Sequence, residues 1–410
     1  MTKPLFDSRR DFLKKGAAGA AGAAVLGGWG SSRVLGANDR IRVAILGSGG
    51  RARGVAGIFN QFPECEIVAV SDVYGPNLDE GMKLATKEGK GYLDYRELLD
   101  RKDIDAVLIG SPDHWHKQMM TDAVRAGKDA YLEKPIMHSI EEGVEMIRAV
   151  DETKRVVQTG TQQRSWEHFI LGKQLVESGK LGKIISVHAY WYQNHIRWSA
   201  AASKVDQSKL DWKRWLGSAP DQPFDWEKFR FWRHYLNFGG GMLTDLLTHW
   251  IDVIQWYMGQ PAPKTVTTTA QRYIFKQWDC PDAATTALEF PGNFMVTFIS
   301  AYNSSIDDGG MEFRGSQATL KIDREHLAVY TEGQKSEPGT LAPAPEIFAR
   351  SERDGTVDHV KNFLECVRSR KTPTAPIQAG FEAARTGWLA NIALARGKRI
   401  EFDPAGNKIS

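Results

Sequence analysis

Apolar residues in the first half of the chain gather into short continuous runs separated by amphipathic stretches. Such runs are typical of strands buried on both faces of a parallel sheet, and the stretches between them have helical spacing. The runs are IRVAIL (41–46), EIVAVSD (66–72), DAVLIG (105–110), DAYLE (129–133) and RVVQTG (155–160). This alternation predicts a doubly wound parallel sheet of the Rossmann type, whose ligand lies at the carboxyl ends of the strands.

The pattern changes after Gly182, where apolar and polar residues alternate as in strands that bury one face of a mostly antiparallel sheet. These runs are KIISVHAYWY (183–192), TVTTTAQRYI (265–274), ATTALEF (284–290), FMVTFIS (294–300) and ATLKID (318–323). A long helical segment (376–397) and a short strand (399–403) follow. The sequence therefore predicts an α/β chain with a Rossmann domain (38–164) and a second α/β domain (165–410).

A glycine-rich turn with GxGxxA spacing follows the first strand. Gly47 permits the tight turn, Gly49 lets the backbone approach a pyrophosphate, and Ala52 allows the helix to pack closely on the strand. The next strand ends at Asp72, where a carboxylate accepts ribose hydroxyls and repels a 2′-phosphate. NAD is therefore favoured over NADP as the cofactor. The residues expected to bind it here are Gly47, Gly49, Gly50, Arg51 and Asp72.

Further cofactor contacts are expected where two later strands end, because ligands bind at this edge of a parallel sheet. These candidates are Ser111, Pro112 and His116 after one strand, and Glu133 and Lys134 after the next. Alternatives remain for both groups. Glu133 and Lys134 could form an exposed loop ion pair, and His114 and His116 could be ordinary hydrogen-bonded loop histidines.

The segment GGGMLTDLLTHWIDVIQWYMG (239–259) predicts an almost wholly apolar, buried helix. Asp245 and His249 are four residues apart and would share one face of it, with Asp252 a further turn along. Buried polar groups need partners, so the pair is either catalytic or a structural Asp–His hydrogen bond. A metal site with a loop histidine is a third possibility, but no distinctive ligand spacing supports it, and we expect no metal.

Aromatic residues are concentrated between Tyr190 and Phe238, where 13 of 49 residues are Phe, Trp or Tyr against 10% for the chain. Aromatic faces suit the C–H face of a sugar ring, and nearby polar side chains could bind its hydroxyls. We expect Tyr190, Arg197 and Tyr235 to contact substrate. Other candidates for the hydroxyls are Asn194, His195 and Arg233. The alternative is that most of these aromatic residues fill the core or an oligomer interface.

Residues 1–37 have the parts of an export signal: a basic segment with Arg9-Arg10, a weakly apolar Ala/Gly run, and small residues near the end. The paired arginines followed by DFLKK resemble a twin-arginine signal, which predicts a periplasmic or otherwise exported protein. A disordered basic tail is the alternative. The run from Gly16 to Gly30 is too short and Gly-rich to be a good membrane span.

Charge and cysteine content argue against a nucleic-acid-binding protein and against a disulfide-rich protein. The same 37 residues hold six of the 53 basic and two of the 50 acidic residues, so the remainder is nearly neutral, unlike a protein that binds nucleic acid. The three cysteines are odd in number and far apart, which indicates small buried side chains and no disulfide framework.

The glycine turn, the LEKP segment ending at Pro135 and the segment GGGMLTDLLTHWID together resemble the Gfo/Idh/MocA oxidoreductases. The resemblance spans about residues 40 to 405. It implies a Rossmann domain, a C-terminal α/β domain with an open sheet, and a sugar or cyclitol substrate between them. It also implies Lys134, Asp245 and His249 as catalytic residues. We further expect a homo-oligomer formed through the C-terminal sheet.

Oxidation of a carbinol needs a hydride acceptor and a base for the hydroxyl proton. His249 is the expected base and Lys134 stabilises the developing alkoxide, although the reverse assignment also fits. Asp245 would orient the histidine or bind a neighbouring hydroxyl. Two other functions remain open: a redox-neutral NAD-dependent glycosidase that acts by transient oxidation and elimination, and a non-catalytic module that carries NAD.

Overall fold

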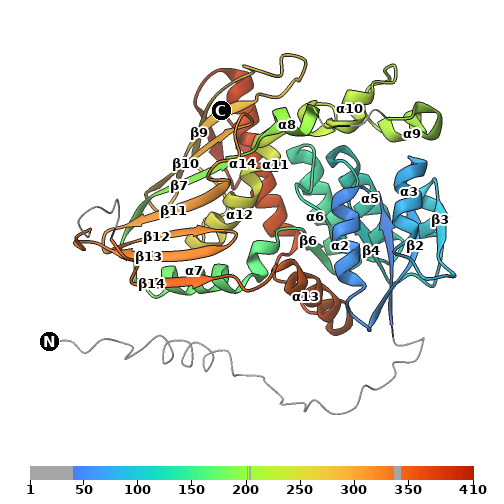
Figure 1. The fold of residues 1–410 in the computed structure, drawn as a ribbon, viewed down its shortest axis with the longest axis horizontal. Coiled ribbons are helices and arrows are strands. Elements are labelled where there is room, and N and C mark those ends of the chain that lie inside the picture. The colour runs from blue at the N-terminus through green and yellow to red at the C-terminus, as the bar shows by residue number, and fades with distance from the viewer. Residues whose placement is uncertain (1–39, 201, 203–204, 337–342) are drawn as a thin grey trace, which may run out of the picture. The chain divides into compact units, whose positions relative to one another are not determined.

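The computed structural model describes residues 40–200, 202, 205–336 and 343–410. The predicted export signal at residues 1–37 lies outside these described residues. Two β-sheets organise the described part of the chain. Between them lie helices α11 (Gly241–Asp245), α12 (Leu247–Met258) and α14 (Ile377–Arg396) (Figure 1).

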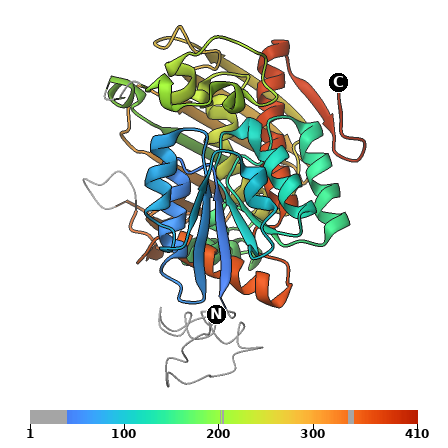
Figure 2. The same ribbon diagram turned by 90° about the vertical axis from the view of Figure 1, so that its right-hand side faces the viewer.

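The first sheet has six parallel strands in the order β3-β2-β1-β4-β5-β6, and helices flank it (Figure 2). Its order reverses between β1 and β4, so their carboxyl ends open a crevice for a ligand. The strands are β1 (Ile41–Leu46), β2 (Cys65–Ser71), β3 (Lys90–Tyr92), β4 (Ala106–Ile109), β5 (Asp129–Leu132) and β6 (Val157–Thr159). The predicted Rossmann sheet is confirmed.

The helices between these strands are α2 (Gly50–Phe59), α3 (Gly75–Met82), α4 (Tyr95–Leu99), α5 (Asp113–Arg125) and α6 (Ile140–Thr153). Serine 139 caps α6, since its side chain accepts a hydrogen bond from the backbone N–H of Glu142. The following elements leave the first sheet and lead to the second: η2 (Gln162–Ser165) and α7 (Glu167–Glu177).

The second sheet has ten strands in the order β14-β13-β12-β11-β7-β10-β9-β8-β15-β16. Its neighbours are antiparallel except for β7 and β10, as the alternating pattern predicts for a mostly antiparallel sheet. The strands are β7 (Ile184–Tyr192), β8 (Thr265–Gln271), β9 (Ala283–Phe290), β10 (Phe294–Ala301), β11 (Gly309–Gly315), β12 (Ala318–Asp323), β13 (His326–Thr331), β14 (Ile347–Arg350), β15 (Ile400–Asp403) and β16 (Lys408–Ile409).

Short helices follow β7 and carry most of the aromatic-rich stretch. They are α8 (His195–Ala200), η3 (Gln207–Lys209), α9 (Trp212–Leu216), α10 (Trp226–Arg230) and η4 (Trp232–His234). Most of their aromatic side chains pack among themselves: the Trp215 ring, for example, lies 4.6 Å from that of Phe238 and 5.4 Å from that of Phe229. Many aromatic residues between Tyr190 and Phe238 therefore fill the core, which was the alternative to contacting a sugar.

The predicted single helix after the three glycines is two helices, α11 (Gly241–Asp245) and α12 (Leu247–Met258). Gly241 has a φ of 64°, and a Cβ there would lie 2.5 Å from the Cβ of Cys280, so only glycine fits at this entry. Both helices contact α14 (Ile377–Arg396), which in turn contacts α6 and β8.

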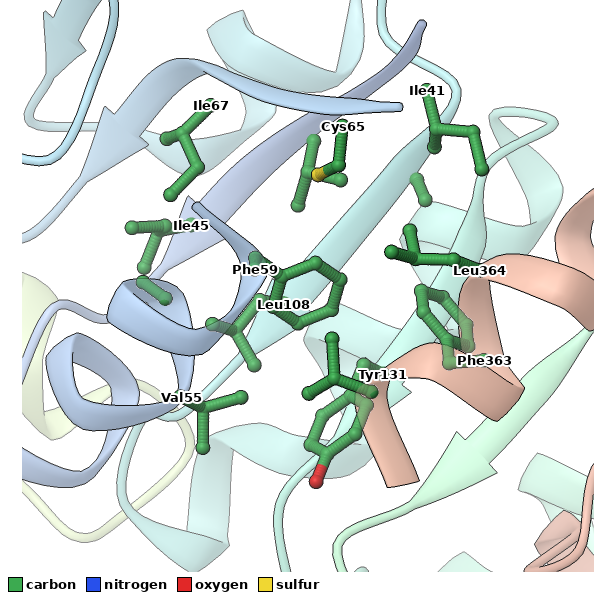
Figure 3. Close-up of a cluster of buried hydrophobic side chains, with 14 of the residues drawn as sticks. Ile41, Ile45, Val55, Phe59, Cys65, Ile67, Leu108, Tyr131, Phe363 and Leu364 are labelled. Carbon is green, nitrogen blue, oxygen red and sulfur yellow. The ribbon is translucent and has the colours of Figure 1, made fainter. Parts of the chain in front are cut away.

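Helix α13 (Thr356–Ser369) completes the core of the first sheet although it comes from the last quarter of the chain. Phe363 packs edge-on against Phe59 and Tyr131, with ring centroids 6.0 and 5.8 Å apart (Figure 3). Edge-to-face aromatic contacts of this kind stabilise a core beyond the area that they bury. The hydrophobic pattern of the sequence did not predict this helix.

The three cysteines are buried and unpaired, as predicted. No helix among the described residues has the length and apolar character needed to cross a membrane.

Candidate active site

The turn between β1 and α2 has the geometry of a nucleotide-binding turn. Gly47 has a φ of 78°, and a Cβ there would lie 2.7 Å from the backbone of Ser111. Gly49 and Gly50 face open space, and Gly49 is the N-cap of α2. Ala52 packs against the backbone of Gly110, where a Cβ would come within 2.6 Å. The free N–H groups of α2 therefore lie open to a pyrophosphate, and the turn fits NAD.

Asp72 follows β2 beside this turn. Its two carboxylate oxygens accept hydrogen bonds from the backbone N–H groups of Ser48 (2.8 Å) and Tyr74 (2.9 Å). Burial raises the pKa of Asp72, and these backbone donors oppose the shift. The carboxylate lies where ribose hydroxyls are expected. Arg53 donates to the carbonyl of Ser48 and is therefore already engaged within the turn.

The loops after β4 and β5 are joined by His116. Its Nδ1 lies 2.7 Å from the carbonyl oxygen of Pro135 and its Nε2 lies 2.9 Å from that of Ser111. Burial lowers the pKa of His116 to about 4. His114 is buried and bonds the carbonyl of Trp215, 3.0 Å from its Nε2. Both histidines thus connect loops, and His116 also borders the pocket described below. Pro112 is the N-cap of α5.

Lys134 joins the two domains. Its Nζ lies 2.5 Å from Oδ1 of Asp245 and 3.1 Å from the carbonyl oxygen of the same residue. That carbonyl is free to accept because α11 ends at Asp245. Arg233 also approaches Asp245, with 3.5 Å between Nε and Oδ1. Burial opposes the charged carboxylate, but Lys134 and Arg233 outweigh it and lower the pKa of Asp245.

Glu133 makes a buried ion pair rather than an exposed one. Its Oε1 lies 2.8 Å from Nε of Arg51, whose side chain is 40% exposed whereas that of Glu133 is 6% exposed. The carboxylate raises the pKa of Arg51. The pair links the start of α2 to the loop after β5, so it also forms one wall of the site.

His249 is separated from Asp245 by the break at Leu246, and the two side chains have different partners. The Nδ1 of His249 lies 3.3 Å from Nε2 of Gln163, and its ring lies 5.1 Å from that of Trp191. Burial, followed by the charges of Lys134, Arg324 and Arg51, lowers the pKa of His249 well below its usual value. The alternative of a structural Asp–His hydrogen bond is therefore wrong, because the Asp245 carboxylate is directed to Lys134 and Arg233.

These side chains border one pocket of about 490 Å³, a volume suited to a small ligand. The predicted residues among its walls are Arg51, Ser111, His116, Glu133, Lys134, Asp245 and His249, together with Asn194, His195 and Arg233. Residues that sequence analysis missed are Asp113, Gln162, Trp191, Gln193, Trp198, Trp232 and Arg324. In the part of the chain that the structure describes, no three His, Cys, Asp or Glu side chains form a group able to hold a metal.

The three predicted substrate contacts are not brought to this pocket. Tyr190 stacks on Tyr192 on the outer face of the second sheet, since alternate residues of β7 face opposite ways and Trp191 takes the inner position. Arg197 is exposed on α8, whereas Trp198 borders the pocket. Tyr235 is buried under Lys228, whose Nζ lies 5.8 Å from its ring.

A signal for one missed residue was present in the sequence. Val187, Ala189 and Trp191 alternate along β7, so Trp191 belongs to the buried face that adjoins α12. Arg324 carries no such signal, because it lies in the turn between β12 and β13 and reaches the pocket only through the fold.

Two family models match the chain. Residues 41–161 match the Gfo/Idh/MocA oxidoreductase family's NAD-binding Rossmann fold, and residues 173–402 match its C-terminal alpha/beta domain. The oxidoreductase YrbE of Bacillus subtilis, described as uncharacterized, is 32% identical over 370 residues, which cover 89% of this chain and 97% of that protein.

More distant relatives have named activities. A myo-inositol 2-dehydrogenase of Thermotoga maritima is 23% identical over 372 residues, covering 88% of this chain and 99% of that protein. A glycosyl hydrolase family 109 protein of Shewanella sp. strain ANA-3 is 27% identical over 229 residues, which is 50% of each chain.

A solved structure has the same fold. Levoglucosan dehydrogenase in complex with NADH and L-sorbose superposes with a TM-score of 0.70 at 17% identity, covering 88% of this chain and 99% of that one. The fold, the nucleotide turn and both family matches agree. The chain therefore belongs to the Gfo/Idh/MocA family of oxidoreductases, with that family's NAD-binding Rossmann domain and C-terminal α/β domain.

Proposed function

We propose that this protein is an exported oxidoreductase that transfers hydride between a carbohydrate carbinol and tightly bound NAD. The observation that carries the proposal is the convergence of Lys134, from the loop after β5, with Asp245 and His249, from the second domain, on one pocket. The nucleotide turn at Gly49 supplies the neighbouring anion site.

When bound, NAD accepts the hydride that leaves the carbinol carbon. Lys134 hydrogen-bonds the hydroxyl oxygen and stabilises the negative charge that develops there. Asp245 pairs with Lys134, 2.5 Å from its Nζ, and holds it in position, which favours His249 over Lys134 as the base. Burial favours the neutral form of His249, whose ring exchanges a proton with the hydroxyl through the nitrogen that Gln163 does not contact.

A carbohydrate fits the mixture of groups around the pocket. Trp198 and Trp232 supply aromatic faces, and Gln193, Asn194 and His195 supply polar atoms. The similarity to proteins named myo-inositol 2-dehydrogenase and levoglucosan dehydrogenase supports the same class of substrate.

The test is reduction of the bound NAD, followed as NADH absorbance, when a panel of cyclitols, aldoses and anhydrosugars is added to the purified protein. We expect at least one compound to reduce the bound cofactor, and this reduction to be lost in a His249→Ala variant that still binds NAD. Wild-type protein that binds sugars and NAD but never transfers hydride would support a non-catalytic module instead.

A redox-neutral glycosidase is the second candidate, favoured by the similarity to a glycosyl hydrolase family 109 protein. Oxidation beside the glycosidic bond acidifies a C–H, elimination expels the aglycone, and the hydride then returns to the product. A panel of p-nitrophenyl glycosides distinguishes the two functions. Release of nitrophenol without net NADH formation identifies the glycosidase, whereas stoichiometric NADH identifies the dehydrogenase.

The outer face of the second sheet supports a homo-oligomer. Met295 and Ile299 on β10 are 53% and 43% exposed, and Ile299 lies opposite Tyr190 of β7. Exposed apolar side chains grouped on a sheet are typical of an interface between subunits. Light scattering should give a mass above one chain for the wild type, and Ile299→Lys should shift it towards the monomer.

A further inference from the structure

Every lysine and arginine side chain around the pocket except one has a carboxylate partner among the described residues. Arg51 pairs with Glu133, and Lys134 and Arg233 share Asp245. Arg324 also borders the pocket, but its Nε is buried without a hydrogen-bond partner, and no carboxylate among the described residues forms an ion pair with it.

Arg324 is held in place by its own turn. The Oδ1 of Asp323 accepts hydrogen bonds from the backbone N–H groups of Glu325 and His326, both at 2.7 Å. The carbonyl of Asp323 is in turn bonded by His168, 2.9 Å from its Nε2. A turn fixed at this many points gives the arginine a defined position, as a binding residue requires.

The guanidinium lies at the catalytic end of the pocket. Its carbon atom Cζ is 4.5 Å from the centre of the Trp191 ring, and that ring is 5.1 Å from the ring of His249. The nucleotide's phosphates belong instead at the Gly49 turn, where the N-terminus of α2 receives them. The guanidinium therefore lies beside Trp191, the ring that separates it from His249.

Burial, and next the charge of Arg51, lowers the pKa of Arg324 to about 10, so the arginine remains charged at neutral pH although its surroundings disfavour the charge. The carboxylates of Asp308, Asp354 and Asp245 act in the opposite direction on the pKa of Arg324, but they do not outweigh burial and Arg51. An anionic ligand would remove this imbalance, whereas a neutral hydroxyl would not.

We infer that Arg324 binds a carboxylate on the substrate, so that the preferred substrate class is a hexuronic acid. A guanidinium stacked on an aromatic ring keeps its planar edge free, and that edge matches the two oxygens of a carboxylate. The inference rests on the proposed function and narrows it from carbohydrates in general to acidic ones.

The test is calorimetric binding to NAD-loaded protein. D-glucuronate and D-galacturonate are each compared with their amides, which have the same shape without the charge. We expect at least one acid to bind about 10-fold more tightly than its amide. Arg324→Gln should weaken that acid about 10- to 100-fold and leave the amide within about twofold. Arg350→Gln is the matched control, an exposed arginine on β14 beside the same turn, and should behave as wild type.

Equal or undetectable binding of acids and amides to the wild type would overturn the inference. So would weaker NAD binding in Arg324→Gln, which would assign the arginine to the cofactor. Thermal unfolding checks that each variant is folded, and Arg324→Lys keeps the charge without the planar fork, so it should bind the acid with intermediate affinity.

Binding and turnover separate this inference from the proposed function. Acid preference in binding, with no hydride transfer to NAD from any sugar, would reject the oxidoreductase and keep the anion site. Hydride transfer from neutral sugars, with no preference for acids in binding, would reject the anion site and keep the oxidoreductase.

Discussion

Nζ of Lys134 and Oδ1 of Asp245 lie 2.5 Å apart, and this contact joins the loop after β5 to the end of α11. Both side chains are largely buried, with 11% and 15% of their surface exposed. Removing either partner leaves the other as a buried charge without its counterion, so the pair acts as a unit. Asp245 therefore pairs with and positions Lys134 rather than His249.

Lys134→Met should lower kcat/KM by at least about 100-fold, because the variant removes the donor that stabilises the developing alkoxide. NAD affinity should change little, since the phosphate-binding turn is intact. Asp245→Asn should lose activity to a similar extent by freeing Lys134. Steady-state kinetics and NAD titration measure both effects, and near-normal turnover of Lys134→Met would show that the pair is structural.

His249→Ala should also lose at least about 100-fold in kcat/KM, on the scale of a general base. The informative control is Asp252→Asn on the same helix, because Asp252 pairs with Arg164 and does not border the pocket. Asp252→Asn weakens the pair with Arg164 and should leave the reaction chemistry intact in the folded fraction.

The tautomer of His249 depends on Gln163. With its amide nitrogen 3.3 Å from Nδ1, Gln163 donates to that atom and leaves the proton on Nε2, the form that gives a proton during ketone reduction. The Oε1 of Gln163 is buried without a partner among the described residues. Rotation of the amide would present this oxygen to Nδ1–H and leave Nε2 free as the base for alcohol oxidation.

Gln163→Glu should raise the pKa of His249, because a carboxylate stabilises the imidazolium and accepts the Nδ1 proton. The acid limb of the pH profile of kcat/KM for oxidation should then move to higher pH. Gln163→Leu should lower kcat about 10-fold without that shift. A role limited to packing predicts that both variants keep the wild-type pH profile.

Sequence patterns predicted the elements whose hydrophobic residues repeat without interruption. The strand IRVAIL became β1, and the long segment from Pro376 became α14. Strand β11 was missed because it begins with two glycines, and α13 was missed because its helical spacing does not reveal its partner. Its Phe363 packs on Phe59, some 300 residues earlier, which only the tertiary fold brings into contact.

The site residues also divide into those that a local sequence pattern predicts and those that only the fold brings to the pocket. Lys134 and His249 lie in short sequence motifs that can be recognised without the fold, so the sequence identified them. The end of α11 at Asp245 was not predicted, since the apolar pattern continues through Leu246, and it leaves the carbonyl of Asp245 to accept a hydrogen bond from Lys134. Arg324 reaches the pocket from a turn between two strands of a distant hairpin, where no local pattern indicates a ligand.

Stability should fall in mild acid. Burial lowers the pKa of His116, His195 and His359 from 6.5 to about 4, so these residues stay neutral in the folded protein. Between those values the unfolded chain binds protons that the folded chain does not, and stability decreases as pH falls, by up to about 1.4 kcal/mol per pH unit for each histidine.

We therefore expect the melting temperature to drop by on the order of 10 °C between pH 7 and pH 5. Asp252 acts in the opposite direction, because burial raises the pKa of its carboxyl and favours the folded state as it protonates. Differential scanning calorimetry across this range checks the sign, and a melting temperature that holds or rises in acid would contradict it.

The export that we propose has a consequence for how the enzyme keeps its cofactor. A twin-arginine passenger folds before export, so it would bind NAD in the cytoplasm and carry it out. Retention for hours needs dissociation slower than about 10⁻⁴ per second. With an association rate constant of about 10⁶ per molar per second, this requires a Kd of about 10⁻¹⁰ M.

A cofactor that does not dissociate must be reduced and reoxidised in the same site, by two substrates or by one substrate before and after a bond cleavage. Protein purified from the exported fraction without added NAD should therefore release close to one nucleotide per chain on denaturation. Empty protein that consumes free NAD in proportion to sugar oxidised would refute the captive cofactor while leaving the oxidoreductase assignment intact.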